Sequence, residues 1–333
     1  MKPPLIQLDH LTRTFEVKRN KIIAVNDVSF SVNESEVLCL VGESGCGKTT
    51  TGRIMAGLLK PSSGKILYNG KNIVDLDKKE FHKYRLGVQM VHQDPYASLN
   101  PAHTVYEILS FPLIHHGFAT PSARQRARDL LDMVDLTPAE DFLDKFPHQL
   151  SGGQRQRVSI ARALTVTPSF IIADEAVSMV DVSIRISLLN TLLRLKEAMG
   201  LAVLFITHDL ALAKYFAWEG RVGVMYLGRL VEISPARQLV DGPQHPYTQV
   251  LLSAIPEADP DRTRNKQQIQ LRSMDIPSLL KLPTGCAFHP RCPKFMGEIC
   301  EREVPKQIFY RDGSSVACHL VSQARQADVV EVV

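Results

Sequence analysis

The sequence predicts an α/β protein in which helices pack against a mostly parallel sheet. Three observations carry this prediction. Short apolar runs recur along the chain, helical patterns separate them, and a glycine-rich turn joins the first apolar run to the first helix. Continuous apolar runs are typical of strands buried on both faces, and strands that alternate with helices favour a layered α/β domain. At 333 residues the chain is long enough for two domains.

Five apolar runs are the expected strands, and the expected helices lie between them. The strands are predicted at 37–41, 88–92, 170–174, 201–207 and 222–227, and the clearest helices at 48–59 and 184–199. A helical subdomain is expected over about 104–165, because amphipathic patterns recur there and the stretch before 150 has no good strand pattern. After Ser234 the chain becomes richer in turn signals, so we expect a first domain over 1–255 and a C-terminal domain over 256–333.

Composition excludes several classes of protein. Hydrophobic residues make up 44% of the chain and charged residues 22%, so the chain can bury a core and is not intrinsically disordered. The net charge of +4 is small and no basic run concentrates it, so we expect no nucleic-acid partner. The longest uncharged stretch, Ile108–Ala123, is too short and too polar to span a membrane. The N-terminus lacks the apolar core of a signal peptide, so we expect a cytosolic chain that reaches a membrane only through partners.

The turn after the first predicted strand matches the phosphate-binding pattern G-x-x-x-x-G-K-[ST] in full. Its residues are Gly42, Glu43, Ser44, Gly45, Cys46, Gly47, Lys48 and Thr49, and Thr50 follows. Such a loop wraps backbone N–H groups around phosphates at the start of a helix. Lys48 is expected to bind the β- and γ-phosphates of a nucleotide, and the Thr49 hydroxyl to bind Mg²⁺. Cys46 is a spacer in this interpretation.

Two acids end the predicted strand at 170–174. Asp174 is expected to hold Mg²⁺, and Glu175 to accept a proton from the water that attacks the γ-phosphate. Ligands of α/β sheets bind at the carboxyl ends of strands, where these two side chains lie. Alone, the pattern also fits a strand that ends in a solvated acidic turn.

A second anion-binding helix start narrows the class of protein. Its residues are Ser151, Gly152, Gly153 and Gln154. Two such helix starts about a hundred residues apart in one chain resemble the ATP-binding cassette (ABC) family, and the resemblance covers about residues 5–260. It implies the fold of a P-loop nucleotide hydrolase and transport-coupled ATP hydrolysis to ADP and phosphate.

The resemblance also implies roles for single residues. Gln93 looks like the glutamine that touches Mg²⁺ and senses the transporter subunit, and His208 like the histidine that contacts the γ-phosphate. Phe15 matches the aromatic residue that stacks on adenine, with core packing as the alternative. In this family two ATP-binding subunits face head to tail. Residues 151–154 are therefore expected to contact ATP bound to the partner, in trans.

Three further stretches resemble the oligopeptide and dipeptide importer branch, and the second (F type) of its two ATPase subunits. They are Gln93–Pro101, Met225–Gly228 and His245–Thr248. The expected partners are a second ATPase subunit, giving a heterodimer, two transmembrane permease subunits and an extracytoplasmic substrate-binding protein. The chain would then lie peripherally on the cytoplasmic face of the membrane. Oligosaccharide import is the alternative within this branch. Soluble ABC proteins of DNA repair or translation fit less well, because the chain has one set of motifs and no sustained heptads.

Four cysteines gather near the C-terminus with spacing C-x₅-C-x₇-C-x₁₇-C: Cys286, Cys292, Cys300 and Cys318. Thiolates close in sequence suit Zn²⁺ or an iron–sulfur cluster, and free thiols remain the third interpretation. Gly285–Pro293 resembles the C-terminal domain of peptide importer ATPases, some of which hold a [4Fe–4S] cluster, so we prefer that cluster over zinc. His289 and His319 are read as neighbouring or surface residues. We expect the region to lie outside the cassette, with no residue that reaches the ATP site.

Overall fold

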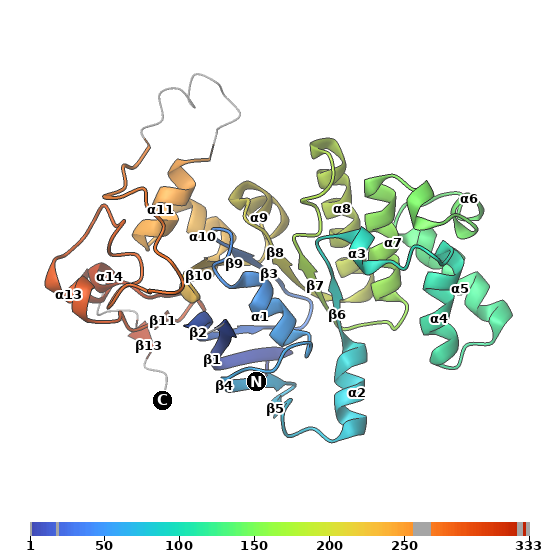
Figure 1. Ribbon diagram of the computed structural model, residues 1–333, viewed down its shortest axis with the longest axis horizontal. Coiled ribbons are helices and arrows are strands. Elements are labelled where there is room, and N and C mark those ends of the chain that lie inside the picture. The colour runs from blue at the N-terminus through green and yellow to red at the C-terminus, as the bar shows by residue number, and fades with distance from the viewer. Residues whose placement is uncertain (1, 18–19, 256–267, 325–328, 331–333) are drawn as a thin grey trace.

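The computed structural model describes residues 2–17, 20–255, 268–324 and 329–330. Two sheets lie at its centre, a group of helices (α4 to α7) lies at one end, and the C-terminal region lies at the other (Figure 1). The predicted α/β class is therefore confirmed, with mixed parallel and antiparallel pairing.

The main sheet contains all five predicted strands. They run parallel in the order β9-β3-β8-β7-β6. Their bounds are β3 Val37–Val41, β6 Val88–Val91, β7 Phe170–Asp174, β8 Ala202–Ile206 and β9 Arg221–Tyr226. The carboxyl ends of β3, β6, β7 and β8 thus meet at one edge of the sheet, where the predicted phosphate loop and acids follow.

Each central strand is buried on both faces, which explains its unbroken apolar sequence. In β3, Cys39 packs into one core cluster, while Leu38 and Leu40 pack into the other. The same alternation holds in β7, where Ile171 and Ile172 belong to opposite clusters. Period-two alternation of side-chain direction therefore divides a uniformly apolar strand between two cores.

A second, antiparallel sheet was missed by the sequence interpretation. Its strands follow the order β2-β1-β4-β5, with bounds β1 Ile6–Val17, β2 Asn20–Val32, β4 Ser63–Tyr68 and β5 Lys71–Asn72. A signal was present: Val28, Phe30 and Val32 are buried at every second position. This sheet shares its core cluster with α1 and with one face of the main sheet.

Helices cover both faces of the main sheet and build the helical end. The bounds are α1 Lys48–Met55, α2 Lys78–Gly87, α3 Pro95–Ser98, α4 Val105–His115, α5 Thr120–Met133, α6 Glu140–Leu143, the short 3₁₀ helix Pro147–Gln149, α7 Gly152–Leu164, α8 Val182–Met199 and α9 Leu210–Phe216. Helix α1 ends earlier than the predicted 59, since Gly57 turns the chain with φ 64°. The α4–α7 group falls where a helical subdomain was predicted.

The C-terminal region continues the main sheet. β10 (Arg229–Pro235) pairs with β9 and with β12 (Ser315–Val316), followed by β11 (Ile308–Tyr310) and β13 (Val329–Val330). Its described helices are α10 Ala236–Asp241, α11 Pro246–Ser253, α13 Glu298–Arg302 and α14 His319–Ala324. The pairing of β10 with β12 therefore joins strands from both sides of the predicted domain boundary at 256. The boundary itself lies in 256–267, outside the described residues.

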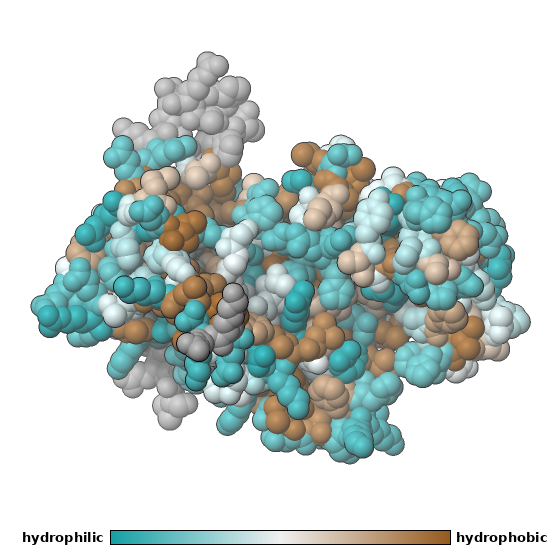
Figure 2. Space-filling view, in the orientation of Figure 1, coloured by the Kyte–Doolittle hydropathy of each residue, from teal (hydrophilic) through white to brown (hydrophobic). Residues whose placement is uncertain are grey.

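Among the helices of the described residues, none has the length and apolar character needed to cross a membrane. The face in Figure 2 is mostly hydrophilic, with apolar residues in separate groups.

Candidate functional site

Glycines shape the predicted phosphate loop between β3 and α1. A Cβ atom on Gly42 would lie 2.1 Å from the carbonyl oxygen of Met225, and one on Gly47 would lie 2.2 Å from that of Ala24. Gly47 also has φ 105° and forms the N-cap of α1. No other residue type fits these two positions without moving the backbone. The loop therefore packs tightly on β9 and β2 and presents the start of α1 to a ligand.

The Lys48 ammonium is held inside the loop. Its Nζ donates to the carbonyl oxygens of Gly42 (2.7 Å) and Glu43 (3.0 Å), and the residue is only 4% exposed. Cys46 is also buried, and burial raises the pKa of its thiol. A protonated, buried thiol is a poor nucleophile, which agrees with the spacer interpretation.

Asp174 at the end of β7 lies against the start of α1. The Thr49 hydroxyl donates to its Oδ1 at 2.9 Å. Burial raises the pKa of the Asp174 carboxyl, so its charge lacks full compensation by solvent. A hydroxyl and a carboxylate at this spacing are oxygen ligands of the kind Mg²⁺ prefers, so the two residues fit that ion.

Glu175 joins two further predicted residues. Gln93 donates from Nε2 to Glu175 Oε2 at 3.0 Å, and His208 Nδ1 lies 3.3 Å from Oε1. Glu175 has φ 46°, a region that side-chain-bearing residues rarely adopt. Strained backbone of this kind clusters at functional sites. Gln93, Glu175 and His208 follow β6, β7 and β8, so the edge of the parallel sheet brings them together.

These groups surround a cavity of about 280 Å³. It is lined by Ser44, Gly45, Gly47, Lys48, Thr49, Thr50, Gln93 and Glu175. Residues that sequence reasoning assigned to the phosphate, to Mg²⁺ and to proton transfer therefore share one cavity. Its cationic loop and its acidic wall could bind a polyphosphate and orient an attacking water.

Asp174 and His208 do not line the cavity themselves but contact Thr49 and Glu175, which do. Two other predicted groups, residues 151–154 and Phe15, are also absent from the lining. Ser151 caps α7 through a capping box: Gln154 N donates to Ser151 Oγ at 3.2 Å, and Ser151 N donates to Gln154 Oε1 at 2.9 Å. Phe15 lies on β1 with the guanidinium of Arg13 4.7 Å from its ring centre. Adenine stacking by Phe15 and contacts in trans by 151–154 stay predictions.

The four C-terminal cysteines converge as buried thiols. Cys286 N donates to the Cys300 carbonyl oxygen at 2.9 Å, and charge on any of the other three cysteines would raise the pKa of Cys286. Burial is the largest cause, and it raises the pKa of Cys286 to about 12 and of Cys292 to about 11. Within the described ranges, no group of three or more His, Cys, Asp or Glu is arranged to hold a metal ion. The structure thus leaves the predicted [4Fe–4S] cluster unsupported.

His289 and His319, the two histidines near these cysteines, are each hydrogen-bonded to a backbone carbonyl oxygen. His289 Nδ1 lies 2.9 Å from the Cys286 carbonyl oxygen, and His319 Nε2 lies 2.9 Å from that of Glu303. His319 is 8% exposed, so it is a buried neighbour of the cysteines.

One expectation about the cysteine region is wrong. Arg291, next to Cys292, donates from Nη1 to Glu43 Oε1 at 2.8 Å and to Oε2 at 3.0 Å. The region therefore reaches the phosphate loop directly. Sequence reasoning missed the contact because it joins positions 248 residues apart.

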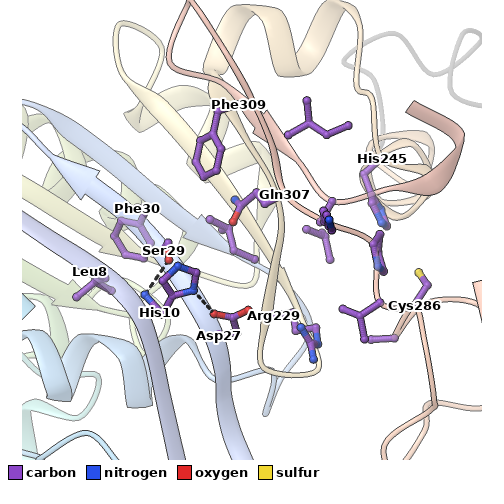
Figure 3. A pocket seen from close by; sticks show the side chains of 18 of the residues that line it. Leu8, His10, Asp27, Ser29, Phe30, Arg229, His245, Cys286, Gln307 and Phe309 are labelled. Carbon is purple, nitrogen blue, oxygen red and sulfur yellow. Dashed lines mark hydrogen bonds and ion pairs between the residues drawn. The ribbon is translucent and has the colours of Figure 1, made fainter. Parts of the chain in front are cut away.

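A larger cavity of about 920 Å³ separates the antiparallel sheet from the C-terminal region (Figure 3). On one side His10 Nδ1 lies 2.6 Å from Asp27 Oδ1, and this contact raises the pKa of His10. On the other side Cys286 and His245 lie near Arg229. The His10–Asp27 pair satisfies its own charges, so it does not itself indicate a ligand.

Comparisons with known proteins agree on one family. The model described as ABC transporter matches residues 25–178, and the model described as oligopeptide/dipeptide transporter, C-terminal region, matches residues 231–300. The chain is 43% identical over 339 residues to a "probable peptide ABC transporter ATP-binding protein" of Sinorhizobium fredii, covering 99% of this chain and 93% of that protein. It is 44% identical over 310 residues to the oligopeptide transport ATP-binding protein AppF of Bacillus subtilis, covering 92% of each.

Solved structures agree as well. The dimeric, post-hydrolysis state of the ATP-binding cassette MJ0796, bound to ADP and Pi, is similar with a TM-score of 0.63 and 31% identity. The similarity covers 70% of this chain and 99% of that one.

Proposed function

Because this chain belongs to the ATP-binding subunits of the ABC transporter family, in the oligopeptide/dipeptide branch, we propose that it powers the import of oligopeptides or dipeptides through partner membrane subunits. The observation that carries the proposal is the single cavity shared by the phosphate loop, Gln93 and Glu175. Relatives named for peptide transport favour peptides over the alternative, oligosaccharides.

Each residue of the cavity has a proposed role in ATP hydrolysis. The N–H groups of the phosphate loop and the Lys48 ammonium bind the phosphates, and Thr49, Asp174 and Gln93 would hold Mg²⁺. When bound, that ion supplies positive charge to the phosphate oxygens. Glu175 orients the attacking water and accepts its proton, because its carboxylate faces the cavity between Gln93 and His208. His208 contacts the γ-phosphate. This assignment is supported by the distances among these side chains.

We propose that hydrolysis needs a second ATPase subunit, in a heterodimer. Residues 151–154 do not line the cavity of their own chain, which supports a role toward ATP on the partner. Near this segment, Met179 is 62% exposed and Val182 is 73% exposed. A related cassette is described as dimeric in its ADP- and Pi-bound state.

Membrane subunits are the proposed partners on the helical end. Exposed apolar side chains gather on α4 and just beyond it, at Phe111, Ile114 and Phe118. Large apolar side chains exposed together favour a protein contact. We place the chain peripherally at the cytoplasmic face of the membrane, working with two permeases and an extracytoplasmic substrate-binding protein.

We propose a division into an ABC domain over 1–255 and a C-terminal domain over 256–333. The matching C-terminal family model starts earlier, at 231, which agrees with the pairing of β10 and β12. A [4Fe–4S] cluster on the four cysteines, with Zn²⁺ as the alternative, stays part of this proposal. Four buried thiols that lie near one another are a suitable set of ligands for the cluster. Among the described residues, however, they are not arranged to hold a metal ion.

Uptake by the assembled complex tests the proposed function. The complex is rebuilt in vesicles with ATP on the side of this subunit, and uptake of labelled di- and oligopeptides is measured beside labelled oligosaccharides. Glu175→Gln should bind ATP, trap a closed dimer and lower turnover by roughly 10²–10⁴-fold. Near-normal turnover would exclude Glu175 as the base. ATP-driven uptake of oligosaccharides alone would replace the peptide substrate.

A further inference from the structure

Two segments that resemble the peptide importer branch contact Glu43 of the phosphate loop, and a third contacts Glu43's partner, Arg291. From 285–293, Arg291 binds both carboxylate oxygens of Glu43, at 2.8 and 3.0 Å. From 245–248, the Tyr247 hydroxyl accepts a hydrogen bond from Glu43 N at 3.2 Å. From 225–228, the Tyr226 hydroxyl accepts a third hydrogen bond from Arg291 Nη1, at 3.3 Å. The Lys48 ammonium holds the remaining polar group, the Glu43 carbonyl oxygen, at 3.0 Å.

The Arg291–Glu43 pair is largely removed from water. The Arg291 side chain is 7% exposed and the Glu43 side chain 24%. Water and salt therefore screen this pair less than a surface pair. The two tyrosines that contact Glu43 and Arg291 are themselves held in place. The rings of Tyr226, Tyr247 and Phe288 pack on one another with centres 4.7 to 5.2 Å apart.

Glu43 is not among the residues that line the phosphate cavity, but the next two residues, Ser44 and Gly45, are. Arg291 therefore has no direct path to a phosphate and can act only through the loop backbone. Loop N–H groups bind phosphate well only when they are already aligned. An ion pair that holds Glu43 in place therefore also helps to hold the backbone N–H groups of the residues that follow it.

We propose that Arg291 is a positioning residue of the ATP site, which sets the phosphate loop through Glu43 and so couples the four-cysteine region to ATP binding. The inference rests on the proposed function, because it takes the loop to be the ATP site. It goes beyond that function by giving the C-terminal region a role within the same chain. Arg291 lies between Cys286 and Cys292, so a displacement of this segment would reach the loop.

The experiment compares Arg291→Met with Arg291→Lys, Glu43→Gln and the double variant Glu43→Gln/Arg291→Met. Calorimetry measures Mg-ATP binding to the full chain, and steady-state kinetics measure ATPase activity in the assembled complex. Arg291→Met should raise the Kd and KM for ATP by roughly ten- to a hundredfold, because hydrogen bonds to a charged group are lost. The kcat at saturating ATP should change little, since Glu175 and its partners are untouched. Arg291→Lys should restore part of the affinity.

The double variant tests whether Arg291 acts through Glu43. If it does, the double variant should bind ATP about as weakly as Arg291→Met alone, because residues acting as a unit are not additive. Fully additive losses in affinity would overturn the proposal, as would unchanged affinity in folded Arg291→Met. If Arg291→Met does not fold, Glu43→Gln and Tyr247→Phe must each weaken ATP binding, and normal binding by either variant would overturn the proposal.

The matched control is a second part-buried ion pair, between Arg221 and Glu36, whose side chains are 17% and 13% exposed. Arg221 begins β9, at the end of that strand away from the phosphate loop. Arg221→Met should lower the melting temperature without raising the KM for ATP. An equal rise in KM would show a general loss of stability and overturn the proposal. Wild-type protein that binds no Mg-ATP would instead refute the proposed function.

Discussion

At the scale of single residues, Gly152 and Gly153 at the start of α7 differ in what a substitution would disturb. A Cβ atom on Gly153 would lie 2.8 Å from Cγ2 of Ile184 in the same chain, so a substitution there disturbs α7 and α8. A Cβ atom on Gly152 would meet only ordinary contacts, the nearest being the Met179 carbonyl oxygen at 3.7 Å. A substitution at Gly152 can therefore test the role in trans without disturbing the packing of its own subunit.

We predict that Gly152→Asp blocks hydrolysis in the assembled complex while the isolated subunit binds Mg-ATP normally. A carboxylate in the first turn of α7 suits that helix, because it faces the positive end of the helix dipole. In the dimer it would face the phosphates of ATP on the partner, and like charges brought together cost several kcal/mol, so turnover should fall by roughly a hundredfold or more.

Lys79→Asp is the control for Gly152→Asp, because it places a carboxylate in the exposed first turn of α2, where no contact with ATP or with a membrane subunit is proposed. ATP binding by the isolated subunit and hydrolysis by the complex are measured for both variants. Normal hydrolysis by the Gly152→Asp complex, or loss of binding by the isolated variant, would contradict the role in trans.

At the scale of elements, α11 begins with a buried histidine. Tyr247 N donates to His245 Nδ1 at 3.0 Å, so the neutral ring caps the helix. Complete burial lowers the pKa of His245 to about 3, against 6.5 for the free side chain. Protonation would place a charge in the core and turn the capping acceptor into a donor.

We predict that His245 makes stability fall in acid. Its folded pKa lies below its unfolded pKa, so its contribution is complete above about pH 6.5 and declines as the pH falls toward 3. Between pH 7 and pH 5 the loss should be about 2 kcal/mol from this residue, at roughly 1.4 kcal/mol per pH unit below 6.5.

His245→Asn keeps a side-chain cap and removes the titration, so it is the matched variant. Urea unfolding of both proteins at pH 7 and pH 5 gives the difference, and groups common to both, such as Glu232 beside His245, cancel. Parallel losses of stability in the two proteins would contradict the role of His245.

How well an element could be predicted depended on how local its signal is. The predicted bounds of β3 and β7 match the observed ones, because an unbroken apolar run of five residues leads into glycine in β3 and one of four residues leads into acids in β7. β1 and β2 were missed although β2 alternates at Val28, Phe30 and Val32. Half-exposed antiparallel strands carry a weaker signal than buried parallel ones, because every second residue is free to be polar.

At the scale of the whole molecule, the same distinction separates the parts of the site that could be predicted from those that could not. The meeting of the phosphate loop, Asp174 and Glu175 at one place could be predicted, because the loop follows β3, the two acids stand at the end of β7, and parallel strands end at one edge. Arg291 could not be assigned, since its contact with Glu43 spans 248 positions and no local pattern encodes it. The branch motifs around Tyr226, Tyr247 and Arg291 were visible, but the contacts that join them to Glu43, directly or through Arg291, needed the structure.

The four cysteines give the last prediction. All four are buried, and burial raises the pKa of Cys286, Cys292 and Cys318, so these thiols stay protonated at neutral pH unless a metal ion replaces the protons. A thiol reagent should therefore label the native protein slowly at these positions and rapidly after unfolding. Metal analysis of anaerobically purified protein separates the three states: iron with sulfide for the cluster, zinc for the alternative, and neither for free thiols. Rapid labelling of native, metal-free protein would contradict the buried arrangement.

Cys292→Ser extends this prediction to the ATP site. A hydroxyl in the buried place of the thiol should lower the melting temperature by several degrees, as expected for a buried polar group without a partner. If the C-terminal region were independent of the cassette, as its sequence position suggested, ATP affinity would not change. Cys292 adjoins Arg291, so we expect the Kd for Mg-ATP to rise in Cys292→Ser. The control is Ala127→Ser, which adds a hydroxyl at a fully buried position of α5 in the same core cluster and should lower stability without the same loss of affinity. Equal affinity in Cys292→Ser and wild type would show that disturbance of the cysteine region does not reach the phosphate loop.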